Sequence, residues 1–191
     1  MLRVDFGGAD RLIPILDDAA RQPTAAGTAQ QVKDGLRDLI NEGAIDLPDS
    51  ALVPGDDAYG RHLLYRSEEH DYVVVTMAWG IGQGTPIHDH AGVWCVEGVW
   101  RGELEVTQYD LKEQAGERFR FERQEQFKAH PGDSGALIPP YEYHTLANLS
   151  PHEPTITLHV YARDLDACSV FEPATPSGWY QRQLKGLSYD N

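Results

Sequence analysis

Apolar residues in the first quarter of the chain recur at helical spacing. Leu12, Leu16 and Ala20 follow one another at intervals of four, and the segment 32–40 repeats the pattern. The polar stretch QPTAAGT separates the two segments, and NEG at 41–43 is typical of a helix end. The pattern predicts helices within about residues 1–50, each with one apolar face packed against another layer.

From about residue 51 the pattern changes to short β-rich runs separated by Gly, Pro, Asp and Asn. Several short strands without helices between them favour a sandwich or closed barrel over a parallel sheet. The tail after about residue 173 is predicted to be a loop with a final packed turn, in which Trp179 and Tyr180 cover the core. The predicted strands are Arg61–Tyr65, Asp71–Trp79, Val93–Glu97, Glu103–Tyr109, Arg118–Phe127, Gly135–Ile138 and Thr155–Tyr161.

Length and charge narrow the class of protein. The 191 residues fit one domain, with a helical region at about 1–50 and a barrel at about 59–172. A net charge of −14 argues against binding to nucleic acid or to an anionic membrane. The two cysteines form no C-x-x-C pair, and neither a signal peptide nor a run of about 18 apolar residues is present. We therefore expect a cytoplasmic protein; its oligomeric state stays open.

Two histidines in the segment PIHDH suggest a metal site. Side chains alternate along an extended strand, so His88 and His90 point to the same side and form a bidentate clip. A third ligand must come from elsewhere, and His144 in IPPYEYHTLAN is the best candidate. Surface histidines also fall at this spacing by chance, so the pair alone is a weak signal.

The surroundings of these histidines make the pattern more specific. A glycine lies six positions before His88, Pro139 lies five before His144, and Asn148 lies four after it. This arrangement resembles the paired motifs of the cupin barrels, and it implies a mainly β jelly-roll barrel. Cys95 stands where many cupins have a metal-binding glutamate.

Three histidines form a neutral ligand set that leaves coordination positions open for a substrate. Imidazole suits Fe, Zn, Cu and Ni alike, so the ligand type does not select the metal. Asp89, between the two histidines, faces away on a strand and is expected to be structural. Glu97 has the parity to face the histidines and is the less favoured alternative ligand.

Other polar residues lie on predicted strands. Thr157, His159 and Tyr161 share one face of a strand. That face either points outward to solvent or lines a cavity in which His159 orients Tyr161 toward the metal. Arg61 is either a surface residue or, if it points inward, a ligand for a substrate carboxylate through two parallel hydrogen bonds.

The ordered combination of these segments is more specific than any one of them. It resembles the cysteine dioxygenase family of thiol dioxygenases, in particular bacterial type I-like members, from about residue 59 to residue 172. The segments that carry the resemblance are Y-G-R at Tyr59–Arg61, W-G at Trp79–Gly80, G-T-P-I-H-D-H at Gly84–His90 with Cys95, H-T-L-A-N at His144–Asn148, T-L-H-V-Y at Thr157–Tyr161 and D-A-C-S-V-F-E at Asp166–Glu172.

The resemblance implies a mononuclear Fe(II) site held by His88, His90 and His144. The substrates would be O2 and a small carboxylated thiol, with its thiolate and amine on the iron and its carboxylate on Arg61. Both oxygen atoms would reach the sulfur and form a sulfinic acid. Sulfur supplies all four electrons, so no reducing cofactor is needed.

The resemblance also implies roles for the residues around the metal. Tyr161 would be the phenol beside the iron, and Tyr59 and Thr157 would join Arg61 in binding substrate. In the family, the cysteine at the position of Cys95 can form a thioether with that tyrosine. The alternative is a buried free thiol.

The identity of the thiol stays open between two choices. Arg61 and Cys95 favour L-cysteine, because relatives that use 3-mercaptopropionate carry Gln and Gly there. Thr157, where serine is usual, and the segment VWCVEGVWRGELE point instead to relatives that use mercapto acids such as 3-mercaptopropionate or mercaptosuccinate. Functions of other classes are a noncatalytic cupin that binds a small anion or acts as a sensor, and a zinc hydrolase or isomerase.

Overall fold

The computed structural model describes residues 5–174 and 178–190. Within them, the chain begins with helices α1 (Ala9–Ala19) and α2 (Ala25–Asn41), followed by a short 3-10 turn at Asp49–Ala51. The Thr24 hydroxyl accepts a hydrogen bond from the main-chain N–H of Gly27, so α2 begins inside the predicted break. Both predicted helices are confirmed. No helix in the described part of the chain has the length and apolar character needed to cross a membrane.

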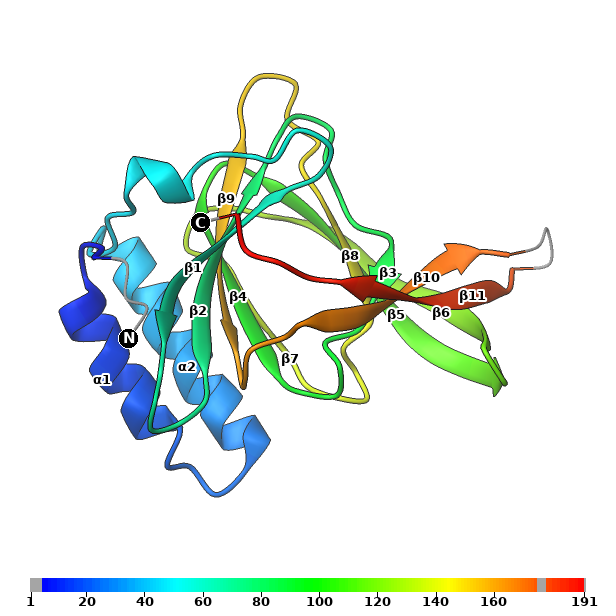
Figure 1. Cartoon of the computed structure of the whole chain (residues 1–191), viewed down its shortest axis with the longest axis horizontal. Helices are drawn as coiled ribbons and strands as arrows, with labels where there is room; N and C mark the ends of the chain where they lie inside the picture. The colour runs from blue at the N-terminus through cyan, green and yellow to red at the C-terminus, as the bar shows by residue number, and fades with distance from the viewer. Residues whose placement is uncertain (1–4, 175–177, 191) are drawn as a thin grey trace.

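The strands form two antiparallel layers (Figure 1). Among the described residues, five strands form one sheet in the order β1-β2-β9-β4-β7, and six form a second sheet in the order β10-β11-β6-β5-β8-β3, which closes on itself. The first sheet comprises β1 (Gly60–Arg66), β2 (Val73–Trp79), β9 (Thr155–Tyr161), β4 (Cys95–Arg101) and β7 (Ser134–Leu137). The second comprises β10 (Ala167–Pro173), β11 (Tyr180–Gly186), β6 (Arg118–Ala129), β5 (Leu104–Ala115), β8 (His144–Ala147) and β3 (Ile87–His88).

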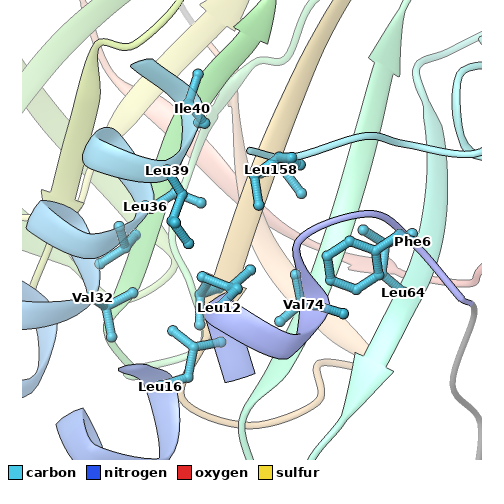
Figure 2. Packing of buried hydrophobic residues seen from close by; sticks show 14 of the residues in the cluster. Phe6, Leu12, Leu16, Val32, Leu36, Leu39, Ile40, Leu64, Val74 and Leu158 are labelled. Atoms are coloured by element: carbon cyan, nitrogen blue, oxygen red, sulfur yellow. The ribbon is translucent and has the colours of Figure 1, made fainter. Parts of the chain in front are cut away.

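The first sheet lies between the helices and the barrel interior. Leu12 and Leu36 of the helices pack against Val74 and Leu158 on the outer face of β2 and β9 (Figure 2). The alternate residues of the same strands, such as Val75, belong to a separate cluster inside the barrel. Both faces of these strands are therefore buried, and burial runs without interruption along β2 and β9.

All seven predicted strands are present, and β3, β8, β10 and β11 are additional. The prediction of a final packed turn in the C-terminal tail is wrong, because Tyr180–Gly186 pairs with β10 along its whole length. This strand is largely exposed and polar, so it has no apolar alternation to mark it. Trp179 and Tyr180 are half-buried, and the Tyr180 ring packs against Phe121 with a centroid separation of 5.6 Å.

Candidate metal centre

Three histidines from separate segments meet inside the barrel. His88 ends β3 and is the register partner of His144, the first residue of β8. Their Nε2 atoms are 3.1 Å apart. One ligand nitrogen from each of His88, His90 and His144 lies within 4.8 Å of the other two. The structure therefore brings together the three residues predicted to hold a metal.

His90 lies outside β3, at the start of a turn that ends at Val93. The Asp89 carboxylate accepts hydrogen bonds from the main-chain N–H groups of Ser169 (2.8 Å) and Ala91 (3.1 Å). Ala91 has a φ of 52°, the left-handed conformation, and so reverses the chain just past His90. The structural role expected for Asp89 is confirmed.

The second nitrogen of each histidine faces an oxygen atom. His88 Nδ1 is 3.2 Å from the main-chain oxygen of Pro86. His144 Nδ1 is 3.3 Å from a Glu97 oxygen, and His90 Nδ1 is 3.6 Å from a Glu142 oxygen. The Pro86 oxygen accepts from His88 Nδ1, which leaves His88 Nε2 free to bind a metal. The Glu97 and Glu142 oxygens lie near the Nδ1 atoms of His144 and His90 without forming a hydrogen bond to them. The donor set therefore fits a divalent transition metal bound through three imidazoles.

Burial also keeps these ligands in the protonation state that a metal requires. Desolvation, with a smaller effect of neighbouring His90, lowers the pKa of His88 to about 3. The pKa of His144 is lowered well below its usual value for the same leading reason. Both rings are neutral at neutral pH, as a metal ligand must be.

Two carboxyl groups lie outside the ligand set. Glu97 does not belong to the three-histidine cluster, and its carboxyl contacts His144 from the outer side. Burial raises the pKa of Glu97 to about 8. Glu142 is buried and accepts a hydrogen bond of 2.8 Å from the main-chain N–H of His90. Glu142 was not predicted from the sequence, where its one signal is an acidic residue inside the segment IPPYEYH.

A line of hydrogen bonds leads to the phenol beside the histidines. Trp79 Nε1 donates to the Thr157 hydroxyl (2.9 Å), which lies 2.7 Å from His159 Nε2. The other ring nitrogen of His159 is 3.4 Å from the Tyr161 hydroxyl. The Tyr161 ring centroid is 6.0 Å from that of His90. The face of β9 that carries these residues is buried, so the solvent-exposed alternative is wrong.

Cys95 lies next to Tyr161 on the neighbouring strand. The two residues are register partners in the β4–β9 pair, and both are buried. Burial raises the pKa of the Cys95 thiol well above its usual value, with a smaller contribution from Glu97 in the same direction. Burial likewise keeps the Tyr161 phenol protonated by raising its pKa.

Arg61 points inward rather than to the surface. Its side chain is buried, with its guanidinium carbon 6.0 Å from the centroid of the Tyr161 ring. Tyr59 stacks on Trp79 with a centroid separation of 4.6 Å and lines the cavity beside the histidines. Arg61 borders that cavity through Tyr161 rather than lining it directly.

Comparisons with known proteins agree with this architecture. Residues 56–174 match the family Cysteine dioxygenase type I. Proteins named Cysteine dioxygenase type 1 from Danio rerio and Homo sapiens are each 32% identical over 107 residues, or 53% of this chain and 50% of the relative. The match thus spans about half the length of these curated relatives.

A solved structure supports the fold. A conserved protein with a double-stranded β-helix domain from Klebsiella pneumoniae superposes with a TM-score of 0.50 and 22% identity, covering 68% of this chain and 93% of the other. The prediction of a mainly β cupin barrel with N-terminal helices is confirmed.

Proposed function

The chain belongs to the cysteine dioxygenase type I family, and from that premise we propose that it is an Fe(II)-dependent dioxygenase that converts L-cysteine and O2 to cysteine sulfinic acid. The observation that carries the proposal is the convergence of three imidazoles beside a buried arginine and a buried phenol. In the overall reaction both oxygen atoms bond to sulfur, and the sulfur supplies all four electrons.

The three histidines would hold the iron, which supplies the electron transfer that lets O2 react with a thiol. The other residues act on the substrate and its surroundings. Arg61 has a guanidinium fork that suits a carboxylate. Tyr59 and Thr157 complete the proposed substrate-binding set. Tyr59 lines the cavity directly, and Thr157 contacts His159, which also lines it.

The hydrogen bonds that lead to Tyr161 have a preferred direction. The Trp79 indole is only a donor, so it occupies a lone pair of the Thr157 hydroxyl. The Thr157 proton then goes to His159 Nε2 at 2.7 Å in preference to the main-chain oxygen of Met77 at 3.5 Å. His159 then carries its proton on Nδ1, which faces the Tyr161 oxygen. With its oxygen acting as acceptor, the Tyr161 O–H can donate either to the neighbouring Cys95 sulfur or to a substrate atom in the cavity.

The test combines metal analysis with an oxygen electrode. We expect protein loaded with one iron to consume one O2 for each sulfinate formed, with L-cysteine giving the highest kcat/KM in a panel with 3-mercaptopropionate, mercaptosuccinate and cysteamine. Zinc-loaded protein is the control and should consume none.

The panel also separates the alternatives. A higher kcat/KM for a mercapto acid would change the assigned substrate but retain the chemistry, because Arg61 suits any short carboxylate. An iron-loaded preparation that leaves every thiol untouched would contradict the proposed function and favour a noncatalytic cupin.

A further inference from the structure

The last described residues of the chain return to Arg61. Leu187 donates its main-chain N–H to Asp166 and lines the cavity beside the histidines. The main-chain N–H of Asp190 donates to the main-chain oxygen of Arg61 (2.8 Å), and the Asp190 carboxylate accepts from the main-chain N–H of Arg61 (2.7 Å). β1 is an edge strand of its sheet, and Asp190 occupies the main-chain hydrogen-bonding groups of that edge at Arg61.

Tyr189 covers one face of the Arg61 side chain. The guanidinium carbon lies 4.2 Å from the centroid of the Tyr189 ring, closer than the 6.0 Å to the Tyr161 ring. The Tyr189 hydroxyl donates to an Asp164 oxygen at 2.6 Å, and the other oxygen of Asp164 pairs with Arg66. The ring that stacks on Arg61 is therefore fixed at its far end.

The nitrogen atoms of Arg61 are left with few partners. One terminal nitrogen donates to the main-chain oxygen of Leu165 at 3.4 Å, and Nε has no hydrogen-bond partner in the described part of the chain. Among the ion pairs of the described residues, none joins a carboxylate to the Arg61 guanidinium. A guanidinium stacked on an aromatic face keeps its N–H groups in the plane where a carboxylate binds in two parallel hydrogen bonds.

We infer that segment 187–190 completes the substrate site, and that Tyr189 is a positioning residue that holds the Arg61 guanidinium and sets the preference for carboxylated thiols. This inference rests on the proposed function for the class of ligand. The segment lies beyond residue 174, where the family match ends, so the inference concerns a part of the chain that the family assignment does not cover.

The test compares thiols with and without a carboxylate. We expect Tyr189→Leu to raise KM for L-cysteine and 3-mercaptopropionate by about 3- to 30-fold, the range for loss of a partly desolvated cation–π contact, while KM for cysteamine is unchanged. Tyr189→Phe keeps the ring and should stay within about 3-fold of the wild type. Tyr141→Leu is the matched control, because Tyr141 is 79% exposed.

A purely structural role would produce a different result. Equal losses for cysteamine and for carboxylated thiols, or no change in either, would overturn the inference. Iron content and melting temperature are measured for each variant. Asp190→Ala, which removes the side-chain bond that ties the segment to β1, replaces Tyr189→Leu if that variant does not fold.

Anaerobic calorimetry with 3-mercaptopropionate and cysteamine separates binding from turnover. If the wild-type protein binds the carboxylated thiol but oxidises no thiol, the proposed function is wrong. The binding comparison between the wild type and Tyr189→Leu still decides the role of Tyr189.

Discussion

Cys95 and Tyr161 face each other as direct register partners on β4 and β9, inside the barrel and beside the three histidines. Directly opposite residues of an antiparallel pair have Cβ atoms about 4.5–5.5 Å apart, close enough for their side chains to meet. The thiol and the phenol ring are thus held together by the sheet itself, before any substrate arrives.

From this pairing we predict a thioether between Cys95 and Tyr161 after turnover. The thiol and a ring carbon would each lose one hydrogen atom, and O2 would take up the two electrons and two protons. Intact mass spectrometry should show a loss of two hydrogen atoms in turned-over wild type and in Cys168→Ser, but not in Cys95→Ser. An unchanged mass in turned-over wild type would contradict it.

Replacement of Arg61 tests the carboxylate contact. Arg61→Gln exchanges a charged, two-pronged donor for a neutral one, so KM for carboxylated thiols should rise by about 10- to 100-fold. Steady-state oxygen consumption measures the effect, with Arg120→Gln on the exposed part of β6 as the control. Unchanged kinetics in Arg61→Gln would mean that the guanidinium does not touch the substrate.

The carboxyl groups behind the ligands should control iron affinity. Glu142→Gln and Glu97→Gln weaken the orientation of His90 and His144, and we expect each to lower iron affinity by about 10- to 100-fold. Competition with a chelator gives the affinity, and Glu125→Gln on the exposed side of β6 serves as the control. Equal affinities in all three variants would exclude an orienting role.

Acid should destabilise the metal-free protein. Burial lowers the pKa of His88 to about 3 and the pKa values of His144 and His159 well below the usual 6.5. Below about pH 6.5 the unfolded chain therefore binds more protons, and the free energy of unfolding falls by up to about 1.4 kcal/mol per pH unit for each histidine. Urea titrations at pH values from about 7.5 down to about 5 measure this slope; a flat profile would contradict it.

Glu97 should act in the opposite direction. Its pKa of about 8 exceeds the ordinary 4.5, so the folded state binds the extra proton and stability is lost as the pH rises between these values. Glu97→Gln should remove this loss of stability with rising pH in the metal-free protein. A decline of the same size in the variant would assign it to another group.

The contact between helices and sheet should contribute strongly to stability. Leu158 is fully buried under α1 and α2 (Figure 2), and Leu158→Ala should cost about 2–5 kcal/mol because it leaves a cavity. Leu184 is 80% exposed, so Leu184→Ala should change stability by less than about 0.5 kcal/mol. Denaturant unfolding of both variants distinguishes a packed interface from a loose one.

The periodicity of apolar residues was sufficient to predict the elements that are long and have one consistent apolar face. Both helices and β9, whose bounds match the prediction, are of this kind. β3 and β8 have two and four residues, and their pairing joins histidines 56 positions apart, so it depends on the whole barrel rather than on a local pattern. β11 is polar and exposed, and periodicity has no signal there.

The site shows a similar division. Motif spacing identified His88, His90 and His144, but alternation left the direction of His159 open. Helices cover one face of β9 and the barrel encloses the other, so buried polar and buried apolar residues alternate without an exposed side. Glu142 lies outside the regular strands, where no period predicts which way a side chain points.

The closed second sheet has a practical consequence for protein preparation. An expression fragment trimmed to residues 56–174 would lack α1, α2 and β11. It would present the bare outer face of the first sheet to water and leave β10 paired only with β3, with its other edge open. An open strand edge and a large bare apolar face each promote aggregation, so crystallisation trials should keep both flanking regions.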